Sequence, residues 1–223
     1  MPLAGAYLFL LGLASGLALL TLSAYRRVSP RWLRSLLFAL GLLVIGRYLT
    51  LALFTQPDAP QRFWPLRHLW FGTSVGLTIP SVFAVDQLIR HPAMTPKKLL
   101  QWFSPFLAVY GAVMLLAPLR PAFDPVAGWS LRLSGGWQAL LSAVQGVFVV
   151  GFVGACALFF KKIPSAPIRV SLVWLAAAQV SLALDGLIPA VGGWYVRPSL
   201  YSEMLALLAI WHAYETSGRL QGL

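Results

Sequence analysis

The chain has 223 residues, of which 59% are hydrophobic and only 10% are charged, and its mean hydropathy is +0.76. Soluble domains carry about 25% charged residues, so this composition argues against an ordinary soluble domain and indicates one compact membrane domain. The net charge of +11 would suit a nucleic-acid-binding protein, but the basic residues gather at the ends of apolar stretches, which excludes nucleic acid as the expected partner.

Seven apolar stretches, each long enough to cross a bilayer, follow one another along the chain. A helix needs roughly 20 residues to cross about 30 Å of hydrocarbon. The predicted helices are residues 3–25, 33–54, 67–89, 99–118, 137–160, 169–191 and 199–218. The sequence therefore predicts an all-α integral membrane protein, a seven-helix bundle in a single transmembrane domain over residues 1–223.

The basic residues are divided unequally between the two ends of the predicted helices. Eleven lie on one side: Arg26, Arg27, Arg31, Arg34, Arg90, Lys97, Lys98, Lys161, Lys162, Arg169 and Arg219. Five lie on the other side, and Arg47 lies within a helix. The positive-inside rule then predicts an outside N-terminus and a cytoplasmic C-terminus. We expect a bacterial-type cytoplasmic membrane, with anionic lipid headgroups as partners of the inner face.

The longest connection, residues 119–136, is rich in proline, glycine and tryptophan. Trp129 and Trp137 suit the depth of the lipid headgroups, so we expect this segment to lie along the outer interface. Cys156 is the only cysteine of the chain, which excludes a disulfide within it.

Shifted comparison of the chain with itself suggests an internal repeat. With a shift of 135 positions, residues 25–28 (YRRV) coincide with residues 160–163 (FKKI). With a shift of 129 positions, Asp86 coincides with Glu215. The first three and last three helices would then form a parallel 3+1+3 repeat, as in membrane carriers. The alternative is that basic inner ends recur through the positive-inside rule alone.

Two charged residues lie deep within predicted helices, Arg47 in the second and Asp185 in the sixth. An unpaired charge at this depth costs at least about 2.5–3.5 kcal/mol, so we expect the two side chains to pair with each other. Such a pair either fixes the packing of two helices or forms a gate or a substrate counter-charge. The sequence leaves both interpretations open.

The third helix is the most polar of the predicted spans. Its polar residues recur at helical spacing on a narrow arc, and Pro80 removes a backbone donor near its middle. These residues are Arg67, Ser74, Thr78 and Ser81, with His68 and Thr73 on adjoining faces. Side chains of this kind either line a cavity or form hydrogen bonds between helices.

Charged residues also recur at the inner ends of the third and seventh helices. His212, Glu215 and Arg219 share one face of the last helix, and Asp86 and Arg90 are spaced as an i, i+4 pair. A solvated structural network is one interpretation. A proton relay through the histidine is the other.

Motifs of known enzymes are absent, and no catalytic residue, cofactor or metal site is predicted. The favoured hypothesis is a small-solute or ion carrier with an outward-facing polar cavity that takes an anionic or zwitterionic solute. Its candidate binding residues are Arg47, Arg67, His68, Ser74, Thr78, Asp185 and Glu203.

Two other function classes remain open. One is a receptor-like or scaffold membrane subunit that acts through a protein partner. The other is an intramembrane lipid-modifying enzyme, for which His68, Glu203 and Asp185 form the candidate cluster on the outer side.

Overall fold

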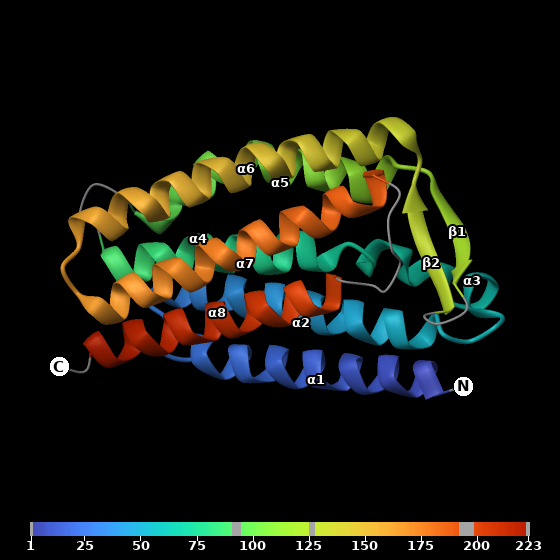
Figure 1. Ribbon diagram of the computed structural model, residues 1–223, viewed down its shortest axis with the longest axis horizontal. Helices are drawn as coiled ribbons and strands as arrows, with labels where there is room; N and C mark the ends of the chain where they lie inside the picture. The colour runs from blue at the N-terminus through green and yellow to red at the C-terminus, as the bar shows by residue number, and fades with distance from the viewer. Residues whose placement is uncertain (1, 91–94, 125–127, 192–198, 222–223) are drawn as a thin grey trace.

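The computed structural model describes residues 2–90, 95–124, 128–191 and 199–221. It is 83% helical (Figure 1). The long helices of the described residues are α1 (Pro2–Tyr25), α2 (Arg31–Leu53), α4 (Gly72–Ile89), α5 (Pro96–Leu116), α6 (Gly135–Lys162), α7 (Ala166–Val191) and α8 (Ser199–Gln221). The shorter elements are α3 (Ala59–Arg62), the 3-10 helix η1 (Trp64–Leu69) and the strands β1 (Leu119–Asp124) and β2 (Gly128–Leu133).

Six helices of the described residues are long and apolar enough to cross a membrane. They belong to α1, α2, η1 with α4, α5, α6 and α7. The fold is thus compatible with an all-α membrane bundle and suggests a polytopic membrane protein. The helix α8 is not among the six, and it carries Glu203, Glu215 and Arg219.

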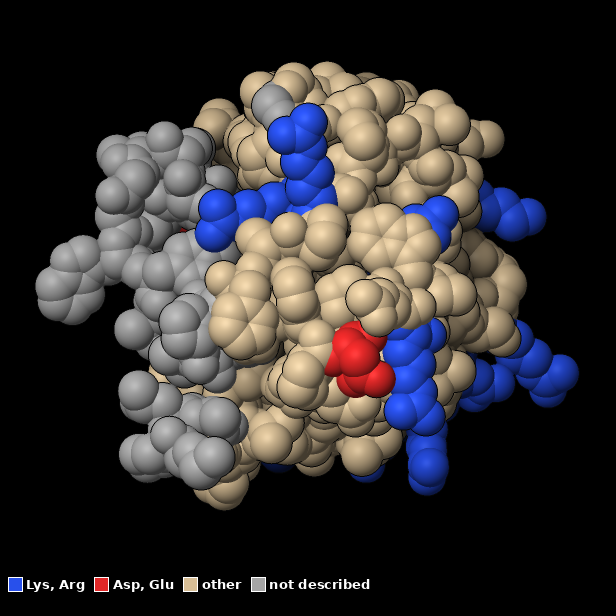
Figure 2. Space-filling view, turned by 90° about the vertical axis from the view of Figure 1, so that its right-hand side faces the viewer, with Lys and Arg blue, Asp and Glu red and all other residues tan. Residues whose placement is uncertain are grey.

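The long helices lie side by side, so the molecule has two distinct ends (Figure 1). The start of α1, the elements α3 and η1 and the strands β1 and β2 lie at one end, which we call the hairpin end. The turns at residues 26–30 and 163–165 and the end of α8 lie at the other, which we call the turn end. Seen from the hairpin end, the surface is mostly uncharged, with separate Lys and Arg side chains (Figure 2).

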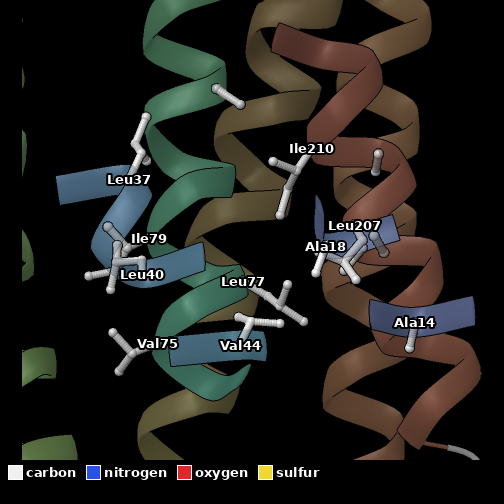
Figure 3. Close-up of a cluster of buried hydrophobic side chains, with 14 of the residues drawn as sticks. Ala14, Ala18, Leu37, Leu40, Val44, Val75, Leu77, Ile79, Leu207 and Ile210 are labelled. Atoms are coloured by element: carbon white, nitrogen blue, oxygen red, sulfur yellow. The ribbon is translucent and has the colours of Figure 1, made fainter. Parts of the chain in front are cut away.

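The core is formed mainly by α1, α2, α4 and α8. The helix α8 packs on α1 and α4 as well as on α7, and α2 packs between α1 and α4. Apolar side chains of these four helices meet there, among them Ala18, Leu40, Leu77, Leu207 and Ile210 (Figure 3). The last three helices therefore do not form a bundle separate from the first three. By contrast, α5 and α6 have few buried side chains.

Two glycines of α4 allow it to approach α2 closely. A Cβ atom at Gly72 would lie 3.1 Å from the carbonyl oxygen of Leu43. A Cβ atom at Gly76 would collide with Val44 Cγ2 and would lie 3.1 Å from the carbonyl oxygen of Leu40. This close contact holds the start of α4 against the second half of α2.

The connection over residues 119–136, for which no strand was predicted, contains two β-strands. The strands β1 and β2 pair antiparallel from Leu119 opposite Leu133. The backbone N–H of Trp129 donates to the carbonyl of Phe54 at 2.9 Å, which attaches the hairpin to the end of α2. Gly128 has a φ of +74° and lies so close to α2 that a Cβ atom would meet the Phe54 carbonyl oxygen at 2.7 Å. The fold is therefore not purely α-helical.

The predicted third helix, residues 67–89, is divided in two. Its first turn belongs to the 3-10 helix η1, and the α-helix begins only at Gly72. Because the α-helical register is interrupted between them, Arg67 does not continue the arc of Ser74, Thr78 and Ser81.

Candidate functional site

Arg47 of α2 is at the centre of a buried polar cluster near the hairpin end. Its Nη1 forms a salt bridge with Oε1 of Glu203 on α8. Its Nε donates to the carbonyl oxygen of Trp70 at 2.5 Å, and Nη1 also donates to Thr73 Oγ1 at 2.5 Å. The two charged side chains are only 11% and 4% exposed. The ion pair therefore joins α2, α4 and α8 inside the protein.

The expected pairing of Arg47 with Asp185 was therefore wrong. The acid that pairs with Arg47 comes from α8, because this helix packs among α1, α4 and α7. Glu203 lies one turn after the start of α8 and is 3% exposed. Glu203 was among the predicted binding residues, but the sequence did not identify it as the partner of Arg47.

The ion pair leaves polar atoms of the cluster without partners. Oε1 of Glu203 receives the hydrogen bonds of Arg47 and, at 3.2 Å, of Thr73. The other carboxylate oxygen, Oε2, is buried and accepts no hydrogen bond from the described residues. The hydroxyl of Tyr48 is buried next to the Glu203 carboxylate, without a well-formed hydrogen bond to it. Buried polar atoms of this kind are costly in a protein interior, so a bound water, ion or ligand would stabilise them.

Asp185 of α7 brings a second carboxylate near the ion pair. It lies beside Ser202 and close enough to Glu203 for the two carboxylates to interact electrostatically. Ser202 in turn contacts Ser181 of α7, with 2.6 Å between the two hydroxyl oxygens. Oδ2 of Asp185 is buried and has no hydrogen-bond partner in the described residues. The cluster thus combines one guanidinium with two carboxylates.

Arg67 and His68 make their contacts elsewhere. The guanidinium of Arg67 lies over the ring of Trp64, 5.2 Å from its centroid. Nδ1 of His68 lies 3.1 Å from the carbonyl oxygen of Met114 on α5. The enzyme hypothesis requires His68 to act with Glu203 and Asp185, and this contact directs one ring nitrogen to α5 instead.

The polar residues of α4 face different neighbours. Ser74 lies next to Tyr110 of α5. Ser81 receives a hydrogen bond of 2.9 Å from the amide of Gln179 on α7. Thr78 between them is buried, with 1% of its surface exposed. Thr73, which sequence reasoning did not select as a site residue, is the one that reaches Arg47.

The charged residues at the turn end form contacts between helices. Glu215 forms a salt bridge of 3.0 Å with Arg27 at the end of α1. Nδ1 of His212 lies 3.1 Å from Ser171 Oγ on α7. Arg219 is exposed. The expected network along one face of α8 is therefore replaced by separate contacts to α1 and α7.

Asp86 and Arg90 form no salt bridge in the described part of the chain. Arg90 ends α4 in a left-handed conformation with a φ of 48°. The expected i, i+4 salt bridge is therefore not formed, although the two charges are close enough to interact electrostatically.

The Arg47 cluster has the chemistry of a binding site for charged groups. A guanidinium recognises a carboxylate, and two carboxylates near one guanidinium leave room for a proton, an ammonium group or a cation. Inside a membrane protein, ionisable groups of this kind are typical of substrate and ion pathways. Comparisons with protein-family models, with curated proteins and with solved structures found no match to this chain.

Proposed function

We propose that this chain is a small-solute or ion carrier in which Arg47, Glu203 and Asp185 form the binding site. One observation carries the proposal: a buried salt bridge has a second carboxylate beside it, and each of the two acids keeps one oxygen without a hydrogen bond from the described residues. A purely structural ion pair would gain stability if these oxygens were hydrogen-bonded.

The charges of the cluster favour a zwitterionic solute. A carboxylate of the solute competes with Glu203 for Arg47, and an ammonium group reaches the free oxygens of Glu203 and Asp185. A simple anion would displace Glu203 and leave two buried carboxylates without a cation. Such competition exchanges one ion pair for another, which is the kind of differential interaction that shifts a carrier between two conformations.

We further propose that all seven long helices span the membrane, with the hairpin end outside. The polar residues of α8 do not oppose this, because Glu203 and Tyr214 are buried and the charged residues Glu215 and Arg219 lie in the last two turns of the helix, at the turn end. The internal repeat also has some support, since α2 begins at Arg31 and α7 at Ala166, 135 positions apart. The Arg47 cluster would then lie in the outer half of the membrane, toward the hairpin end.

Cysteine labelling tests this orientation. In a Cys156→Ser background, single cysteines at Ser29 and Gln61 provide exposed sites at the turn end and the hairpin end. We expect a membrane-impermeant maleimide applied to intact cells to label Gln61→Cys and to label Ser29→Cys only after the cells are broken. The opposite pattern contradicts the orientation, and equal labelling of both sites from outside means that α2, which separates them, does not span the membrane.

The carrier proposal is tested by ligand-dependent stability. Thermal unfolding of the purified protein is measured with a panel of amino acids, small organic anions and amines. We expect zwitterions to raise the unfolding temperature, because a ligand that binds only the folded state stabilises it. Asp185→Asn should fold but lose most of this response, since the neutral amide has no charge to pair with an ammonium group.

The matched control is Asp58→Asn, which removes one carboxylate from an exposed position at the hairpin end. It should respond to zwitterions as the wild type does. If no compound of the panel stabilises the wild type, or if Asp185→Asn responds fully, the cluster is structural and the carrier proposal loses its support.

A further inference from the structure

We propose that a cavity between α4, α5 and α6 binds a hydrophobic cation, such as a lipophilic ammonium or phosphonium ion. This cavity is separate from the Arg47 cluster. It lies toward the turn end, where α4 and α6 end and α5 begins. The inference does not rest on the carrier function proposed above.

The cavity has the size and shape of a site for a small organic molecule. Its volume is about 460 Å³, within the range of about 300–1,000 Å³ that is typical of ligand pockets. Aromatic side chains form much of its wall: Trp102, Phe103, Phe148, Phe152 and Phe159. Most of the other lining residues are aliphatic, so the cavity excludes a strongly hydrated ligand.

One charge faces this apolar space. Asp86 of α4 is the only Lys, Arg, Asp or Glu among the lining residues, and its side chain is half-buried. No described residue forms a salt bridge with it, although Arg90 at the end of α4 is close enough to interact with it electrostatically. A carboxylate in low-dielectric surroundings is stabilised by a cation.

The aromatic walls add to the same preference. The face of an aromatic ring carries partial negative charge, and rings around a pocket bind quaternary ammonium ions through cation–π attraction. A carboxylate and five aromatic rings therefore both favour a positive ligand. An anionic amphiphile would be repelled by Asp86, and a neutral acyl chain would gain nothing from it.

The cavity is accessible from the side of the bundle. Trp102 and Val147 border it and are 76% and 77% exposed. Both lie on helices with apolar outer faces, which in a membrane contact the lipid chains. A hydrophobic cation dissolved in the bilayer can thus enter between α5 and α6 without crossing the core of the protein.

Binding of tetraphenylphosphonium to the purified full-length chain in neutral phosphatidylcholine nanodiscs tests the proposal. Tetraphenylborate has nearly the same shape and the opposite charge, so it separates charge recognition from partition into apolar space. We expect saturable binding of the phosphonium with one site per chain and no saturable binding of the borate. Asp86→Asn should weaken phosphonium binding at least about tenfold, and Asp86→Glu should retain most of it.

A pair of glycine variants locates the site. Gly151 lines the cavity, and a Cβ atom there would meet nothing within 4 Å, so Gly151→Leu fills the space without a clash at the backbone. Gly154 lies on the same helix with the same free space but does not line the cavity. Gly151→Leu should abolish saturable binding, and Gly154→Leu should leave it unchanged.

Three results would overturn the proposal. One is equal binding of the two ions, which would mean apolar partition only. Another is phosphonium binding that Asp86→Asn leaves intact. The third is equal behaviour of Gly151→Leu and Gly154→Leu. Thermal unfolding of each variant shows that it is folded, and Asp86→Glu keeps the test valid if Asp86→Asn does not fold.

Discussion

Replacing Arg47 alone with Met, or Glu203 alone with Leu, should destabilise the protein by about 3–5 kcal/mol. Each single change leaves the other charge buried without its partner, because the two side chains are only 11% and 4% exposed. The double variant, with Arg47→Met and Glu203→Leu together, should be much closer to the wild type. Two apolar side chains of similar volume then fill the space and no stranded charge remains.

The measurement is the free energy of unfolding in detergent for the wild type, both single variants and the double variant. A double-mutant cycle from these four values gives the interaction between the two residues. The control is Arg62→Met, an exposed arginine at the hairpin end, which should change stability by less than about 0.5 kcal/mol. If the losses of the two single variants simply add, the salt bridge does not couple α2 to α8.

The helices were predictable because membrane spans are defined by length and apolarity. The predicted second helix, residues 33–54, is α2 (Arg31–Leu53), and the predicted residues 169–191 lie within α7 (Ala166–Val191). The hairpin was missed although its signal is in the sequence. In β2 the side chains of Leu131 and Leu133 are buried and Arg132 between them is exposed, the alternation typical of a strand.

The members of the Arg47 cluster were also visible in the sequence, because charged residues in apolar stretches are rare. The sequence did not show which acid pairs with Arg47, because the pairing depends on how α8 packs among its neighbouring helices. One signal was available. Glu203 shares a face of α8 with Ala206, Ile210 and Tyr214, at helical spacing, and this mostly apolar face is buried.

The contacts at the turn end were unpredictable for a different reason. Spacing along one helix shows which side chains share a face but not which neighbouring helix that face meets. Glu215 therefore pairs with Arg27 of α1, although Arg219 lies one turn away in sequence. The predicted Asp86–Arg90 pair failed for a reason of backbone conformation. It assumed that the helix continues through Arg90, but Arg90 is left-handed and ends α4.

Gly76→Ala should destabilise the protein by about 1–3 kcal/mol, the usual cost of overpacking a close contact. The new Cβ atom would collide with Val44 Cγ2, which is held on a branched side chain, and would crowd the carbonyl of Leu40. The two helices must then move apart beside the Arg47 cluster. We therefore also expect a smaller stabilisation by zwitterions, because Thr73 and the Trp70 carbonyl, which contact Arg47, are positioned by the same helix contact.

Gly146→Ala on α6 is the matched control, since a Cβ atom there meets nothing within 4 Å. Replacing glycine by alanine within a helix is otherwise favourable by about 0.5–1 kcal/mol, so this variant should be as stable as the wild type or more stable. Unfolding free energies of both variants are compared in the same detergent. A gain in stability for Gly76→Ala equal to that of Gly146→Ala would mean that α2 and α4 are not held by this contact. The position of Arg47 against α4 would then need another cause.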